Sequence, residues 1–169
     1  MEYLIIDGYN LINAWSDVFK LEDNSLEECR DKLFSLLSNY QGYKKTKIIV
    51  VFDAHLLKGS QEKIGNYDNL TIVFTKENET ADNYIEKFVY KLGSTNIIRV
   101  VTSDYLEQTM ILRNGGFRVS PREFRLEILV ANDNIKEVSN EIRMKRNTIM
   151  SHLEPELLQR LEKLRRDKF

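Results

Sequence analysis

The chain of 169 residues is poor in several residue types, and each shortage excludes a class of protein. It has a single cysteine, Cys29, so an intramolecular disulfide framework is impossible. It has only two prolines and seven glycines, and no tract rich in Pro or Ser, which excludes low-complexity and linker-rich architectures. Its longest apolar runs, such as IIVVF at 48–52, are too short to span a bilayer.

The beginning of the chain also lacks the pattern of a secretory leader. Glu2 and Asp7 occur there, and no basic segment is followed by a long apolar one. We therefore expect no signal peptide, no membrane partner and a cytoplasmic location. The length suffices for one domain with a sizeable hydrophobic core.

The net charge of −1 conceals an uneven distribution. Residues 113–169 hold 13 Lys and Arg against 9 Asp and Glu, whereas the first 112 residues hold 12 against 17. An acidic body with a basic end suggests a polyanionic partner beside a cation-binding site. On charge alone, solvated charges on long helices are the favoured interpretation.

Short β-branched runs predict four strands and a weaker fifth. They cover residues 3–7, 47–53, 70–76, 96–104 and 117–120. Because most of these runs are almost continuously apolar, they suit a parallel sheet that is covered on both faces.

Helical patterns alternate with these runs. The first covers about residues 25–40, with Ser25 and Glu28 as a capping box and Cys29 on the apolar stripe. The second covers residues 80–92 and ends before Gly93, and the third covers residues 104–114. Ser120 and Glu123 predict a further start, followed by helical stretches near 134–147 and 155–167. The predicted fold is α/β, with a doubly wound, mainly parallel sheet, helices on both faces and additional C-terminal helices.

The acidic residues are placed where such a fold binds ligands. Asp7, Asp53 and Asp104 each end a predicted strand, and Glu79 and Asp82 lie at the start of a predicted helix. The carboxyl ends of parallel strands form one edge of the sheet, so these side chains are expected to gather there. Asp82 and Glu86 are four residues apart and share a helix face.

Each acid also has a purely structural interpretation. Asp104 can cap the helix that follows it, and Asp7 can accept a hydrogen bond from the backbone of the turn that follows it. Asp82 and Glu79 can be stabilised by the positive end of a helix dipole. Each of these interpretations is favoured singly. Taken together, several neighbouring anions repel one another strongly, and such a cluster usually holds a divalent cation.

Ligand chemistry narrows the choice of cation. Carboxylate oxygens suit Mg²⁺ or Mn²⁺, whereas zinc prefers His or Cys, of which the chain has only three, far apart. Such a site activates water for attack on a phosphodiester. No Walker-type glycine loop and no Gly-x-Ser-x-Gly elbow is present. A phosphoacceptor receiver-like domain is disfavoured because Asp7 is followed by Gly8, and the fifth run by VSPREF without a lysine.

Five segments together resemble a known family. LIIDGYNLI, VFD, ETADNYIEK, VVTSD and SPREF, in this order, resemble the NYN-domain ribonucleases of the PIN-like group, and within it the bacterial YacP-type family. The resemblance covers about residues 1–147, so we expect a nuclease domain there and a helical extension over 148–169. It implies an endoribonuclease that depends on Mg²⁺ or Mn²⁺, associates with the ribosome and cuts messenger RNA.

The resemblance also implies roles for individual residues. Asp7, Asp82 and Asp104 match metal ligands, Asn10 matches an asparagine that places substrate or a metal-bound water, and Asp53 lies at the matching end of the second strand. Which of Glu79, Asp82 and Glu86 is the main ligand from the helix stays open, with Asp82 preferred for its Thr-Ala-Asp setting.

Substrate contacts are expected from polar and basic residues outside this acidic set: Ser103, Arg122, Arg143, Lys145 and Arg146. The alternative to an enzyme is a non-catalytic RNA- or ribosome-binding module on the same fold. The complete set of acids argues against it, because a pure RNA binder gains nothing from an anionic pocket.

Overall fold

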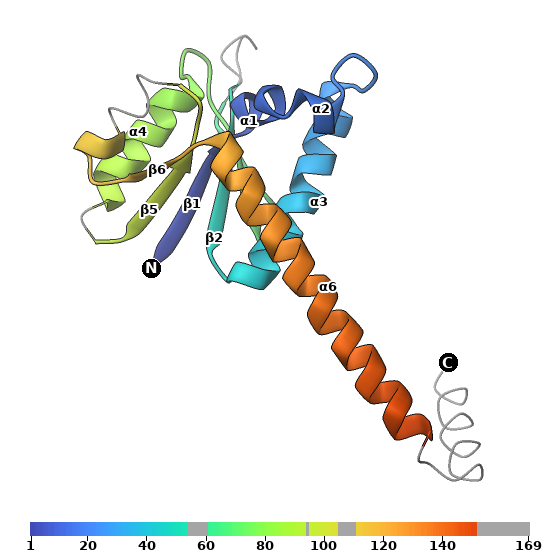
Figure 1. Ribbon diagram of the computed structural model, residues 1–169. Helices are drawn as coiled ribbons and strands as arrows, with labels where there is room; N and C mark the ends of the chain where they lie inside the picture. Colours follow the sequence, from blue (N-terminus) through green and yellow to red (C-terminus); the bar gives the residue numbers. More distant parts are fainter. Residues whose placement is uncertain (54–60, 94, 105–110, 152–169) are drawn as a thin grey trace. The chain divides into compact units, whose positions relative to one another are not determined.

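The computed structural model describes residues 1–53, 61–93, 95–104 and 111–151 (Figure 1). Its six strands are β1 (Glu2–Asp7), β2 (Lys47–Phe52), β3 (Lys63–Tyr67), β4 (Leu70–Phe74), β5 (Ile97–Val101) and β6 (Phe117–Val119). The helices are α1 (Gly8–Ala14), α2 (Ser16–Phe19), α3 (Leu26–Lys44), α4 (Ala81–Leu92) and α6 (Pro121–Ser151). No helix in these ranges is both long and apolar enough to cross a membrane.

The strands form one sheet in the order β3-β4-β2-β1-β5-β6. All neighbours are parallel except β3 and β4, so the predicted doubly wound α/β fold is confirmed. From β1 the chain builds outward through β2 and β4 on one side and through β5 and β6 on the other. The strand order therefore switches between β1 and β5, where ligands bind in open α/β sheets.

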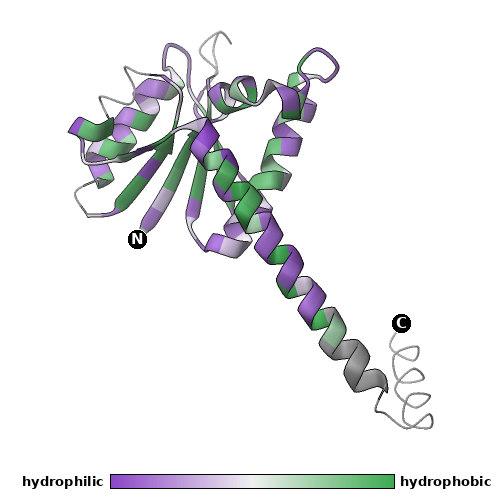
Figure 2. Ribbon diagram, viewed as in Figure 1, coloured by the Kyte–Doolittle hydropathy of each residue, from purple (hydrophilic) through white to green (hydrophobic). Residues whose placement is uncertain are grey.

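Side-chain alternation gives the sheet two covered faces. Ile5, Val51 and Val100 pack with Ile85 and Val89 of α4 in one cluster of buried residues. On the opposite face, Phe52 contacts Phe34 of α3. The central strands are mostly hydrophobic along their length, and α3 and α4 have both polar and apolar sides (Figure 2). Burial on both faces explains why these strands have apolar runs rather than alternating ones.

The helix boundaries largely follow the capping signals. Ser25 and Glu28 form both bonds of a capping box before α3, and Ser120 and Glu123 form the same bonds before α6. Gly93 closes α4 by donating its N–H to Val89, 2.7 Å away. Cys29 is buried on α3, as its place on the apolar stripe predicts.

Three elements in the N-terminal half were not predicted: α1, the four-residue α2 and β3. Helix α1 begins directly after β1, where only a sharp turn was expected. Strand β3 is an edge strand that pairs antiparallel with β4, and all five of its residues are exposed. It has no apolar pattern because neither face is buried, so sequence periodicity gives no signal for it.

The helical stretches expected after residue 120 are one helix. α6 continues from Pro121 to Ser151 because no glycine or proline occurs between Pro121 and Pro155 to stop it. The expectation of a separate helix over 134–147 was therefore wrong. The helices expected at 155–167 and over most of 104–114 lie outside the described residues, although 111–113 are helical.

The chain divides into two compact units, residues 1–129 and 130–169. The predicted end of the nuclease domain at residue 147 lies within α6 and stays a prediction. The sheet and the four predicted acidic site residues, Asp7, Asp53, Asp82 and Asp104, belong to the first unit.

Candidate active site at the carboxyl edge of the sheet

Asp7 is both the last residue of β1 and the N-cap of α1. The Asn10 N–H donates to its Oδ1 at 3.1 Å, so the structural interpretation of Asp7 as a cap is correct. The alternation that puts Ile5 under α4 puts Asp7 on the same face, two residues further along. The carboxyl group is thus fixed at the edge of the sheet and half-buried beneath the start of α4.

Gly8 follows Asp7 for a packing reason. A Cβ at this position would lie 2.3 Å from the ring carbon Cε1 of Phe52, far inside van der Waals contact. The backbone of Gly8 is not in the left-handed region, so the packing of Phe52 and not a positive φ calls for glycine here. Glycine instead lets the first turn of α1 pass directly over β2.

Four aspartates act on one another at this edge, and we call Asp7, Asp53, Asp82 and Asp104 the aspartate cluster. Burial, opposed by the hydrogen bond from the Asn10 backbone and supported by the Asp82 and Asp53 charges, raises the pKa of the Asp7 carboxyl from 3.8 to about 6. The pKa of Asp82 is also raised, first by burial and then by Asp104 and Asp53. Asp7 is therefore coupled to Asp82 and Asp53, and Asp82 is coupled to Asp104 and Asp53, so that Asp82 links the members of the cluster.

The structure at the start of α4 distinguishes Glu79, Asp82 and Glu86, among which the sequence could not identify the main ligand. Thr80, not Asp82, caps the helix by accepting from the Asn83 N–H at 3.2 Å. Glu79 is buried and paired with Lys87, with 2.5 Å between Oε1 and Nζ. Asp82 acts on Asp7, whereas Glu86 is absent from the charges that shift either Asp7 or Asp82. The geometry favours Asp82 as the helix member of the cluster.

Asn10 and Ser103 join the two strands that flank the switch in strand order. The Oδ1 of Asn10 accepts from the Ser103 N–H at 3.1 Å and from its hydroxyl at 2.9 Å. Next to them, the Asp104 N–H donates to the Oγ1 of buried Thr102 at 3.0 Å. These bonds hold the segment after β5, and with it Asp104, beside the start of α1. A contact of Asn10 or Ser103 with substrate stays a prediction.

The predicted basic contacts lie elsewhere. Arg122 is exposed in the first turn of α6, and the backbone at Arg143, Lys145 and Arg146 belongs to the same helix in the second unit. The side chains of these three residues lie outside the described part, so their role is untested.

The donor set suits a hard cation, but the described side chains do not form a ready-made cage. Every member of the aspartate cluster offers oxygen ligands only, as Mg²⁺ and Mn²⁺ require. Within the described ranges, no three Asp, Glu, His or Cys residues are grouped so that they could hold a metal ion. Mg²⁺ commonly keeps several waters and uses one or two carboxylates, so this arrangement is compatible with it.

An α/β sheet with acids gathered at its strand switch defines the nuclease-like class that the sequence motifs indicate. The family model described as a YacP-like NYN domain matches residues 4–166, and the chain belongs to this family.

Its relatives include the protein YacP of Bacillus subtilis (strain 168), which is 41% identical over 167 residues and 98% of both chains. Two crystal structures of Rae1 (YacP) from Bacillus subtilis are similar in fold. The W164L mutant has a TM-score of 0.74 at 35% identity over 97% of this chain and 99% of that one. The other has a TM-score of 0.72 at 41% identity over 98% and 95%.

Proposed function

We propose that this protein is a metal-dependent endoribonuclease that hydrolyses phosphodiester bonds of messenger RNA in association with the ribosome. The observation that carries the proposal is the aspartate cluster at the strand switch, where burial and neighbouring charges raise the pKa of Asp7 to about 6. A fold gains no stability from such mutual repulsion, so a cationic ligand is the simplest reason for it. The family resemblance supports the RNA substrate, the ribosome partner and a cytoplasmic location.

The residues of the chain have distinct parts in this proposal. Asp7, Asp82 and Asp104 would hold Mg²⁺ or Mn²⁺, with Asp53 adding negative charge beside them. The bound cation would supply water activation and stabilisation of the leaving oxygen. Asn10 holds the segment of Ser103 and Asp104 against α1, and Thr102 fixes the backbone at Asp104 from below. These bonds hold Asp104 through its backbone rather than through its carboxylate oxygens.

The test is cleavage mapping of a messenger on translating ribosomes with the wild type, Asp82→Asn and Glu86→Gln. Glu86 is the matched control because it lies on the same helix but is not among the charges that shift the pKa of Asp7 or Asp82. We expect Asp82→Asn to lose about 100-fold or more in cutting rate, since several kcal/mol of transition-state stabilisation depend on the cation. Glu86→Gln should cut at the wild-type rate.

Metal binding needs a separate measurement, because ribosomes themselves require Mg²⁺. Calorimetric titration of the free protein with Mn²⁺ should give binding to the wild type and to Glu86→Gln, and much weaker binding to Asp82→Asn. A wild type that sediments with ribosomes but leaves the messenger intact would favour the alternative, a non-catalytic binding module. Equal cutting by all three proteins would remove Asp82 from the site.

A further inference from the structure

The two flanks of α4 differ in charge. With about 100° per residue, Ala81, Ile85 and Val89 face the sheet, and Asp82 and Glu86 fall together on one flank. Tyr84, Lys87 and Lys91 fall together on the other flank. The second flank faces a groove of about 350 Å³, which is also lined by Lys76 after β4 and by Glu62 before β3.

The groove begins at the same edge of the sheet as the aspartate cluster. Lys76 lies two residues after β4, and Glu62 precedes Lys63, which pairs with Phe74 at the carboxyl end of β4. From there the groove follows α4 through Tyr84 and Lys87 to Lys91. The two flanks of α4 are about one helix diameter, 10 Å, apart. A chain that crosses the start of α4 can therefore contact both the aspartate cluster and the groove.

The charges in the groove favour an anion. Lys87 forms an ion pair with Glu79, whose side chain is only 7% exposed. The charge of this buried acid in the groove is therefore already neutralised. Among the described residues, no ion pair involves Lys76 or Lys91, and both are exposed. Glu62 is the one exposed acid among the lining residues.

The groove also offers an aromatic surface. Tyr84 and Phe88 are only partly buried and pack against the core cluster from its rim. Phe88 is held edge-on against Tyr3, with 5.7 Å between ring centroids. Lysines beside a supported aromatic ring are the combination that binds single-stranded nucleic acid, since phosphates contact the cations and bases stack on the ring.

We propose that this groove is a second RNA subsite, in which Lys76 and Lys91 contact phosphates and Tyr84 stacks with a base of the single strand that leads to the aspartate cluster. The inference rests on the proposed function for the identity of its ligand. It assigns substrate binding to residues for which the sequence alone gives no motif.

The test is binding of a fluorescein-labelled, mixed-sequence, single-stranded 12-mer RNA in EDTA, followed by anisotropy at several salt concentrations. The Lys76→Gln/Lys91→Gln variant should bind several-fold more weakly and reduce the slope of log K against log salt by about 1.4, or 0.7 per lost contact. The matched control is Lys20→Gln/Lys44→Gln, which removes the same charge from two exposed lysines at the ends of α2 and α3, away from α4. The control should leave the slope at its wild-type value.

Three further variants separate stacking and charge from loss of folding. Tyr84→Phe keeps the ring and should bind like the wild type, whereas Tyr84→Leu should bind about fivefold or more weakly. Glu62→Gln removes the exposed acid and should tighten binding, a gain that a damaged fold does not produce. Thermal melts confirm that each variant is folded.

The outcomes distinguish this proposal from the proposed function. Equal salt slopes for the groove and control variants, or a wild type that does not bind the RNA at low salt, would overturn the subsite. Binding through the groove without cleavage of any messenger would leave the subsite standing and overturn the nuclease. Cleavage that depends on Asp82 but not on Lys76, Lys91 or Tyr84 would support the nuclease and overturn the subsite.

Discussion

Asp7 has two roles with conflicting requirements. As the N-cap of α1 it needs an oxygen that accepts from the Asn10 N–H, which either a carboxylate or an amide provides. As a half-buried member of the aspartate cluster it has a raised pKa and is costly to ionise. Because the pKa is near 3.8 in the unfolded chain and about 6 in the fold, folding stability falls as the pH rises between these values.

Asp7→Asn separates these roles. The amide keeps the cap and removes the charge, so at pH 7.5 without metal the variant should unfold at higher urea, with a gain of up to about 3 kcal/mol. Near pH 3.5, where the native carboxyl is protonated, the two proteins should be equally stable. Asp7→Ala should fall about 1 kcal/mol below Asp7→Asn, because it lacks the cap. A variant Asp7→Asn that is less stable than the wild type at pH 7.5 would show that Asp7 is chiefly a structural residue.

Gly8 gives a second prediction at the same scale. Gly8→Ala puts a methyl group against the Phe52 ring and should lower the free energy of unfolding by about 1–3 kcal/mol. Gly42→Ala is the matched control, because it lies exposed in α3 with nothing within 4 Å of its Cβ position. It should stabilise the protein by about 0.5–1 kcal/mol through helix propensity. Equal effects of the two changes in urea melts would contradict the packing argument.

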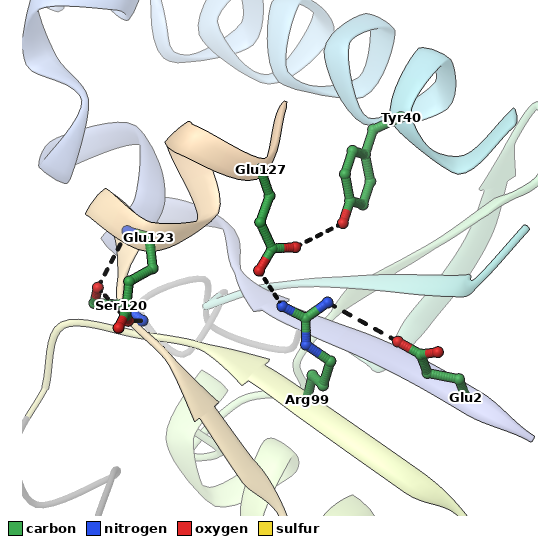
Figure 3. Close-up of polar contacts among 6 residues, drawn as sticks. All are labelled: Glu2, Tyr40, Arg99, Ser120, Glu123 and Glu127. Atoms are coloured by element: carbon green, nitrogen blue, oxygen red, sulfur yellow. Dashed lines mark hydrogen bonds and ion pairs between the residues drawn. The ribbon is translucent and has the colours of Figure 1, made fainter. Parts of the chain in front are cut away.

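At the scale of elements, the start of α6 is held by polar contacts as well as by buried Phe124, which packs against Trp15 and Tyr40. Glu127 accepts from the Tyr40 hydroxyl of α3 at 2.8 Å and pairs with Arg99 of β5, which also faces Glu2 (Figure 3). Burial, followed by the bond to Glu127, raises the pKa of Tyr40 to about 12, so the phenol stays protonated and donating. A second, exposed pair joins Arg125 to Asp17 at 2.7 and 2.9 Å.

The Glu127–Arg99 and Asp17–Arg125 pairs should contribute differently to the free energy of unfolding, because the second pair is more exposed than the first. Glu127→Ala leaves half-buried Arg99 without its main partner and removes the acceptor of Tyr40, so we expect a loss of about 2–4 kcal/mol. Asp17→Ala should cost less than about 1 kcal/mol, because water screens an exposed pair. Chemical denaturation of both variants checks this, and a larger loss for Asp17→Ala would mean that burial does not set the order.

At the scale of the whole molecule, the predicted RNA contacts Arg143, Lys145 and Arg146 belong to the second unit, whereas the aspartate cluster belongs to the first. The prediction that Arg143, Lys145 and Arg146 contact phosphates rather than bases is tested by replacing all three with Gln. Ribosome or RNA binding should weaken for all sequences alike, and its salt slope should fall by up to about 2 on single-stranded RNA. An unchanged slope in salt-dependent binding assays would return these residues to an ordinary solvated helix surface.

The sequence by itself determined the features that depend on neighbours three or four residues apart. The capping boxes at Ser25 and Ser120 and the stop at Gly93 are formed by bonds within one turn, so their signals are complete in the local sequence. The apolar runs identified five of the six strands, and the acids at their ends indicated one edge of the sheet. The continuity of α6 has a local cause as well, the absence of glycine and proline, although the hydrophobic pattern led us to expect separate helical stretches.

Only the tertiary structure decided what depends on residues far apart in the chain. Strand β3 exists because β4 offers it an edge, and its own exposed residues carry no pattern. Gly8 is required by the Phe52 ring of another strand. Glu79 and Asp82 look equivalent in sequence, yet one is neutralised by Lys87 and the other acts on Asp7. Burial and electrostatic coupling are set by what packs nearby, and packing brings together residues that the local sequence does not relate.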